Sequence, residues 1–267
     1  MKPKVPPLGF VSIVKLPMRS LRMIIAYDGT LFGGWQRQPQ QRTVQAELER
    51  ILEKITGEKS AIVASGRTDA GVHALSQVVG FRSHTQLSEA DLKRAFNAEL
   101  PEDIFVFEVS PAPHDFHPIR DAVRKRYRYL IQDDRVPNLF NRSYCWRVFQ
   151  KLNVEAMAES AESLIGEHDF KAYQTGGSSR LTTIRTIYDI VVERRPCEYT
   201  DRVEIEIEAD GFLYNMVRNI VGTLTRVGRG TQSTSWPGEV LASLDRKQAG
   251  MTAPAQGLYM QWVKYDV

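Results

Sequence analysis

Residues 60–82 read SAIVASGRTDAGVHALSQVVGFR and predict two short strands joined by a glycine-flanked loop. The runs 60–65 and 76–82 contain the β-branched residues that favour strands. The loop between them carries one carboxylate, Asp69, and one guanidinium, Arg67. A loop held between two rigid strands can present such side chains for chemistry. The segment therefore indicates a functional site in preference to a linker.

Four further elements around this pair complete a recognisable order. Residues 21–27 and 104–109 predict strands, and two helices with periodic apolar residues are expected to begin after Thr43 and after Ser88. The resulting order is strand, helix, strand, strand, helix, strand. This is the split βαβ pattern of ferredoxin-like units, which have mixed pairing and helices on one face of the sheet.

The same order is expected to recur after a proline-rich connector at residues 110–113. The expected elements are strands at 124–132, 183–193, 202–208 and 258–265, and helices at 153–165, 212–227 and 237–244. We therefore predict an α+β fold in which two ferredoxin-like βαββαβ halves form one mixed, mainly antiparallel sheet with a central cleft. The predicted domains are 21–110 and 111–267, preceded by a loosely ordered extension at 1–20.

Composition excludes several protein classes. A chain of 267 residues can bury a core without a disulfide or a metal. Cys145 and Cys197 lack partners at ligand spacing, which argues against a zinc site and against a secreted disulfide framework. No apolar run has the length of a membrane span. We expect a cytoplasmic protein that uses no metal. The net charge of +3 does not by itself indicate a polyanionic partner.

Two charged side chains could form a catalytic pair. Asp69 can act as a nucleophile or a base, although Asp in such a loop can also simply bond its own backbone in a turn. Arg218 stands beside the apolar face of the helix predicted at 212–227. If that helix packs under the cleft, Arg218 could pair with Asp69, because an unpaired buried arginine is very costly. The alternative is an arginine that reaches solvent.

The strand predicted at 124–132 carries a second candidate surface. Alternation places Lys125, Tyr127 and Tyr129 on one face and Arg124, Arg126 and Arg128 on the other. An aromatic ring beside cations suits an unstacked base held near phosphates. The alternative is that the tyrosines fill the core and the arginines are ordinary surface residues. His73, His114 and His117 lack the spacing of a metal site.

Several of these segments together resemble the TruA family of tRNA pseudouridine synthases. The resemblance runs from about residue 21 to the C-terminus, and separate motifs in the right order make it specific. The motifs are Tyr27-Asp28-Gly29, Gly34-Trp35-Gln36-Arg37-Gln38, the 66–73 loop, Asp115-Phe116-His117, Arg126-Tyr127-Arg128-Tyr129, Met216-Val217-Arg218-Asn219 with Gly222, and Gly257-Leu258-Tyr259.

The resemblance implies the pseudouridine synthase fold and a cofactor-free homodimer. Its reaction would be the isomerisation of uridine to pseudouridine at positions 38, 39 and 40 of the tRNA anticodon arm. Asp69 matches the nucleophile, which attacks either C6 of the uracil or C1′ of the ribose. Tyr127 matches the tyrosine that packs on the target base and is placed for proton transfer. Arg218 matches the arginine paired with the nucleophile, and Arg67 matches an arginine that helps to turn the nucleotide out of its stack.

The same motifs contain Arg37, Arg126, Arg128 and His117, which we expect to contact the tRNA. Two other readings compete with this one. A catalytically silent RNA-binding module would use the basic and aromatic strand but leaves the Asp69 loop unexplained. A metal-free hydrolase would use Asp69 but leaves the basic strand unexplained.

Overall fold

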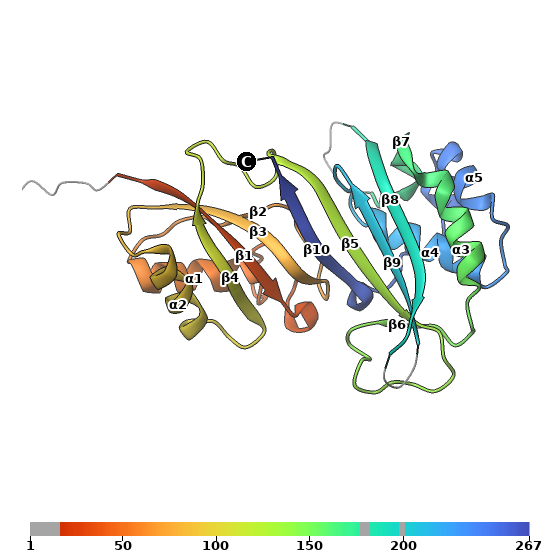
Figure 1. Cartoon of the computed structure of the whole chain (residues 1–267), viewed down its shortest axis with the longest axis horizontal. Coiled ribbons are helices and arrows are strands. Elements are labelled where there is room, and N and C mark those ends of the chain that lie inside the picture. The colour runs from red at the N-terminus through yellow and green to blue at the C-terminus, as the bar shows by residue number, and fades with distance from the viewer. Residues whose placement is uncertain (1–16, 177–181, 198–200, 267) are drawn as a thin grey trace, which may run out of the picture.

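The computed structural model describes residues 17–176, 182–197 and 201–266. Within these residues the chain forms one 10-stranded sheet, and its main path runs through eight strands (Figure 1). In spatial order these are β4 (Ile104–Pro111), β1 (Arg19–Tyr27), β3 (His73–Ser83), β10 (Leu258–Tyr265), β5 (Ala122–Gln132), β9 (Arg202–Ala209), β8 (Ile184–Arg195) and β7 (Gly166–Asp169). The two-residue strands β2 (Val63–Ala64) and β6 (Trp146–Arg147) pair with β3 and β5.

The first unit of the sheet has the predicted order β1, α1, β2, β3, α2, β4. Helix α1 (Val44–Thr56) begins where the Thr43 side chain accepts a hydrogen bond from the backbone N–H of Ala46. It ends at Gly57, whose φ of 73° is left-handed and therefore favours glycine. Helix α2 (Glu89–Glu99) begins at Ser88, which caps it through the N–H of Asp91. The predicted caps of both helices are confirmed.

The second unit repeats this order as β5, α3 (Val154–Ala161), β8, β9, α4 (Met216–Gly228) and β10. Its strands lie in the order β10-β5-β9-β8, and those of the first unit in the matching order β4-β1-β3-β2. The units join where β10 pairs with β3 in parallel at residues 73–74, beside the short β2 pairing at 79–80. The predicted mixed, mainly antiparallel α+β sheet is confirmed.

Several details differ from the sequence prediction. The strand predicted at 60–65 is limited to β2 at Val63–Ala64, and β6 was not predicted. Helix α3 ends at Ala161 and not at 165, and the unpredicted strand β7 follows it. Helix α4 begins at Met216 and not at 212, because Asn215 takes a left-handed conformation with φ of 60° that a helix cannot contain. Part of the extension predicted at 1–20 is ordered, since β1 begins at Arg19, whereas residues 1–16 lie outside the described residues.

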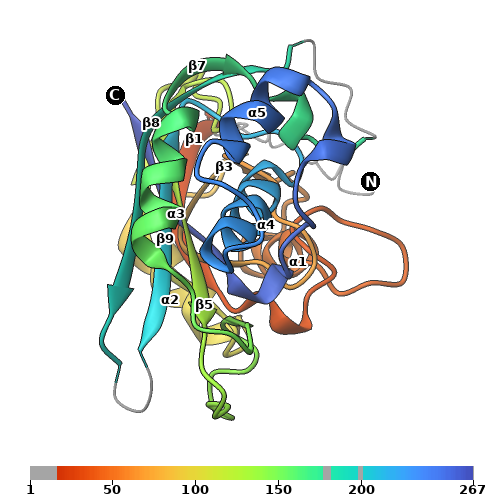
Figure 2. The same cartoon turned by 90° about the vertical axis from the view of Figure 1, so that its right-hand side faces the viewer.

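One continuous apolar core underlies both units and includes Leu21 of β1, Tyr129 of β5 and Met260 of β10. Figure 2 shows α1 and α4 on one side of the strands β5, β8 and β9. A further helix, α5 (Trp236–Ser243), packs near α3 and α4. The short 3-10 helices are Gly29–Leu31, Glu162–Leu164, Phe170–Tyr173, Arg246–Gln248 and Ala255–Gly257. Among the described residues, no helix is both long and apolar enough to cross a membrane.

Candidate active site

The Asp69 loop lies between β2 and β3 and is fixed by bonds to its backbone and to Thr68. The N–H of Trp35 donates to the carbonyl of Thr68 at 2.9 Å, and the Thr68 hydroxyl lies 2.8 Å from that of Tyr27. The Gln77 amide donates to the Gly66 carbonyl at 2.8 Å. These bonds link the loop to β1, to β3 and to the segment before α1. The position of Asp69 in the loop is therefore well defined.

Two glycines allow neighbouring segments to approach this loop closely. A Cβ added at Gly29 would lie 2.0 Å from the carbonyl oxygen of Val72. A Cβ at Gly34 would lie 2.7 Å from that of Thr68, and Gly34 also has a φ of +95°. No side chain fits at either position. The glycines of the Asp28-Gly29 and Gly34-Trp35 motifs therefore serve to pack the Asp69 loop.

Asp69 forms an ion pair with Arg218 of α4. The Oδ2 atom of Asp69 lies 3.1 Å from Nη1 of Arg218, and their side chains are 33% and 17% exposed. Arg218 also donates from Nε to the carbonyl of Ala253 at 2.7 Å and from Nη1 to Oδ1 of Asn215 at 3.0 Å. The carboxylate is therefore held by a guanidinium from the second unit while it stays accessible to a substrate.

Tyr127 of β5 lies beside the same loop. A Cβ built on Gly66 would be 3.7 Å from its hydroxyl, and its ring meets that of Phe212 edge-on with centroids 5.1 Å apart. Burial, followed by the charges of Tyr27 and Asp69, raises the pKa of Tyr127 far above its ordinary value. The phenol therefore keeps its proton at neutral pH. Its strand neighbour Lys125 points to the same face and donates from Nζ to the carbonyl of Ser65 at 2.7 Å.

Among the other predicted site residues, Arg67 adjoins this group, and Arg126 and Arg128 lie apart from it. Arg67 is exposed beside Asp69, and within the described ranges it has no ion pair. Arg126 and Arg128 point to the opposite face of the sheet. There Arg126 pairs with Asp189 at 2.6 Å and with Glu206 and Glu208 at 2.8 Å, while Arg128 pairs with Glu204 at 3.1 Å.

Two more predicted contacts have local roles in the structure. Arg37 forms an ion pair with Glu49 of α1. His117 accepts backbone hydrogen bonds at Nδ1 from Ile119 and Arg120, at 3.2 and 3.3 Å. The structure therefore brings Asp69, Arg218 and Tyr127 together, and it leaves Arg37 and His117 in ordinary helix and turn contacts.

His73 links three segments near the loop. Its Nδ1 accepts from the N–H of Gly29 at 3.0 Å and lies 3.1 Å from Oδ1 of Asp28, and its ring stacks on Tyr259 with centroids 4.7 Å apart. Burial lowers its pKa. The part of the chain that the structure describes contains no group of three metal-ligating side chains. His73 therefore has a structural role, since its contacts connect the Asp28 turn and β10 to β3.

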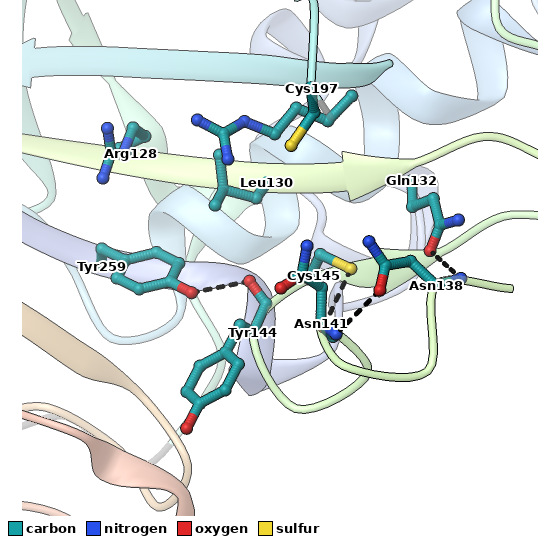
Figure 3. A pocket seen from close by; sticks show the side chains of 10 residues that line it. Arg128, Leu130, Gln132, Asn138, Asn141, Tyr144, Cys145, Cys197 and Tyr259 are labelled. Carbon is teal, nitrogen blue, oxygen red and sulfur yellow. Dashed lines mark hydrogen bonds between the residues drawn. The ribbon is translucent and has the colours of Figure 1, made fainter. Parts of the chain in front are cut away.

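A pocket on the opposite face does not include Asp69. It lies between β5, β10 and the segment around Tyr144, whose carbonyl accepts from the Tyr259 hydroxyl at 2.6 Å (Figure 3). Both cysteines, distant in the sequence, line this pocket as free thiols. This pocket is therefore separate from the Asp69 and Arg218 pair.

Comparison with known proteins identifies the family of this chain. The family model described as tRNA pseudouridine synthase matches residues 23–119 and 160–266. The chain belongs to the tRNA pseudouridine synthase family. The matched ranges of this family include Asp69 and Arg218, and Tyr127 lies in the segment between them.

Members of the tRNA pseudouridine synthase family are similar to this chain along almost its whole length. A protein named tRNA pseudouridine synthase A from Thermoanaerobacter sp. (strain X514) is 44% identical over 93% of this chain and 100% of its own. One of the same name from Acetivibrio thermocellus is 43% identical with the same coverage. Among solved structures, a chain of a Cbf5-Nop10-Gar1 complex is 13% identical and covers 90% of this chain and 57% of its own, with a TM-score of 0.33.

The site also contains residues that the sequence did not reveal. Asn215 and the carbonyl of Ala253 hold the Arg218 guanidinium, and neither was among the predicted site residues. Every residue has a backbone carbonyl, so the residue type at 253 could not reveal this contact. Asn215 left no capping signal either, because it lies inside the helix predicted at 212–227 and makes no capping bond in the structure.

Proposed function

We propose that this protein isomerises uridine to pseudouridine at positions 38, 39 and 40 in the anticodon stem-loop of tRNAs, with Asp69 as the nucleophile and without a cofactor. The observation that carries the proposal is the 3.1 Å pair between Asp69 and Arg218 beside the protonated phenol of Tyr127. Family membership supports the reaction and the tRNA substrate.

The target base must leave its stack before it can meet Asp69. Extrusion costs a few kcal/mol, which stacking and phosphate contacts offset. Arg67 is exposed beside Asp69 and has no ion pair within the described ranges, so its charge is available to a phosphate or to the vacated stack. Arg126 and Arg128 would first have to exchange carboxylate partners for phosphates. Arg67 is therefore the strongest of the proposed tRNA contacts.

The reaction leaves the atomic composition of the uridine unchanged. The Asp69 carboxylate attacks either C6 of the uracil or C1′ of the ribose, and the N1–C1′ bond breaks. The base turns and a C5–C1′ bond forms. The bond to Asp69 breaks in that same displacement if C1′ was attacked, or by elimination from C6 if C6 was attacked. The proton on C5 leaves while N1 gains one. Arg218 stabilises the carboxylate charge when a bound base displaces water from it. Tyr127 keeps its proton at rest, so it can donate to or relay a proton at the base.

Asp69→Asn tests this assignment because it keeps the size of the side chain and removes its charge. We expect no pseudouridine in transcribed tRNA, mapped at nucleotide resolution, and an unchanged affinity for that tRNA. Asp266→Asn is the matched control, since it makes the same change at an exposed carboxylate at the end of β10. Turnover by purified Asp69→Asn would remove Asp69 from the nucleophile role.

The same assay separates the competing functions. A catalytically silent RNA-binding module would bind the tRNA and leave every uridine unchanged. A hydrolase acting on another substrate would neither bind nor modify it.

We also propose that the protein is a cytoplasmic homodimer, as its family resemblance implies. A dimer would let one tRNA contact both subunits, because the anticodon arm and the elbow lie too far apart for one small site. Sedimentation of the protein with and without tRNA measures the subunit stoichiometry, and a monomer in both states would contradict the dimer.

A further inference from the structure

We propose that Asn215 is a positioning residue that holds the Arg218 guanidinium in the orientation that pairs with Asp69. This inference rests on the proposed function of the Asp69 and Arg218 pair. Asn215 lies directly before α4, one turn ahead of Arg218.

The side chain of Asn215 does not do what an asparagine at this position ordinarily does. Such a residue caps its own helix by accepting from a backbone N–H of the first turn. Asn215 makes no such bond. Its Oδ1 accepts from Nη1 of Arg218 at 3.0 Å, and its Nδ2 donates to the Thr175 hydroxyl at 3.2 Å. The side-chain amide of Asn215 is therefore hydrogen-bonded to Arg218 through its oxygen and to Thr175 through its nitrogen.

The bonds to Arg218 define the plane of the guanidinium. Nη1 carries two hydrogens, and its two acceptors are Oδ2 of Asp69 at 3.1 Å and Oδ1 of Asn215 at 3.0 Å. Nε donates to the carbonyl of Ala253 at 2.7 Å, and the N–H of Ala253 donates to the backbone carbonyl of Arg218 at 3.1 Å. Loss of the Asn215 acceptor would free the Nη1 end to rotate away from Asp69 while Nε stays bound.

The backbone at position 215 restricts which residue can do this. Its φ of 60° and ψ of 9° are left-handed, a conformation that glycine takes freely and that Asn and Asp tolerate better than other residues. Glycine has no acceptor for Nη1. Aspartate would add a charge that competes with Asp69 for the guanidinium. Asparagine meets both requirements, which fits the tendency of such conformations to persist at functional sites.

Asn215→Gly tests the proposal because it removes the amide and relieves the backbone. We expect a single-turnover rate about 10- to 100-fold lower, the range for a lost hydrogen bond to a charged group. The affinity for tRNA and the midpoint of thermal unfolding should not fall. The matched control is Leu244→Gly, which makes the same backbone change at a φ of 54° directly after α5. A wild-type rate in Asn215→Gly, or a slower rate explained by weaker tRNA binding or lower stability, would overturn the proposal.

Two further measurements separate this inference from the proposed function. In an Arg218→Ala background, Asn215→Gly should change the residual rate no further, because its only route to catalysis is lost. Additive effects would overturn it. A crystal structure of Asn215→Gly should show the Arg218 guanidinium displaced from Asp69 or in several conformers, and an unchanged pair would also overturn the inference. That readout holds even if the unaltered protein forms no pseudouridine, a result that would instead refute the proposed function.

Discussion

Arg218 makes hydrogen bonds to three separate parts of the chain: the Asp69 loop, the residue before α4 and the segment before β10. A guanidinium is suited to this because its donors form a fixed planar fork. Together the three bonds restrict the orientation of the Arg218 guanidinium. It is therefore fixed beside the Asp69 carboxylate before a substrate binds. Such preorganisation is what makes a charged group effective in catalysis.

At the residue scale we expect Arg218→Ala to lower turnover much more than affinity. The rate should fall by about 10²- to 10³-fold, the effect of removing one preorganised electrostatic partner. The affinity for tRNA should change little, because the side chain is only 17% exposed and faces Asp69. Single-turnover kinetics and binding titrations measure the two quantities. Arg226→Ala, at an exposed position of the same helix, is the control, and an equal rate in both variants would show that the pair has no role.

The Asp69 and Arg218 pair could be predicted from the sequence through the family resemblance, because the cost of an unpaired buried charge alone left open an arginine that reaches solvent. Asn215 could not be predicted in the same way. Its function depends on a left-handed backbone and on an arginine three residues later, and neither produces a periodic pattern. Arg126 and Arg128 were placed on the correct strand face by alternation, but their carboxylate partners come from β8 and β9 and depend on strand pairing.

At the scale of elements, local signals predicted most helices and strands. The caps at Thr43 and Ser88 work through side chains within three residues, so the sequence contains the whole cause. Strand β7 has no such signal, since Gly166–Asp169 lacks alternating apolar residues and exists by pairing with β8. The predicted start of α4 at residue 212 was wrong. The apolar pattern of the helix continues back into residues 212 and 213, where the backbone is not yet helical.

Helix α4 and the segment before β10 are in direct backbone contact, which gives a second prediction at this scale. A Cβ at Gly222 would lie 1.7 Å from the carbonyl oxygen of Met251. Gly222→Ala should therefore cost at least about 2 kcal/mol of unfolding free energy. It should also slow pseudouridine formation at temperatures where the variant is folded, because the same segment carries the Ala253 carbonyl that holds Arg218.

Denaturant unfolding measures the first effect of Gly222→Ala and single-turnover kinetics the second. Gly176→Ala is the control, since a Cβ there meets no atom of the described residues within 4 Å. Equal stability of the two variants would contradict the close contact.

At the scale of the whole molecule, acid stability should depend on Asp133. Burial alone would raise its pKa, but hydrogen bonds from Arg194 at 2.8 Å and from the N–H of Leu152 at 2.8 Å lower it below the ordinary value. A carboxyl with a lowered folded pKa stabilises the protein above its unfolded pKa of about 4. That contribution disappears as the pH falls through the lower, folded value.

The variant Asp133→Asn should accordingly lose about 2 kcal/mol of unfolding free energy at neutral pH. The difference from the unaltered protein should shrink as the pH falls below about 4 and through the lower, folded pKa of Asp133. Denaturant titrations across this range measure it, with Asp134→Asn at the neighbouring position as the control. A difference that stays constant down to about pH 2 would show that the Asp133 charge is not responsible.

The two units are joined by a strand that comes last. Because β10 follows every other described strand in the sequence, a ribosome synthesises it after all of them. Until it emerges, β3 and β5 have no strand between them to fix how the halves that carry Asp69 and Arg218 are placed. A polypeptide that ends between residues 219 and 257 would therefore contain both charged residues and yet lack the strand that brings them into a working centre.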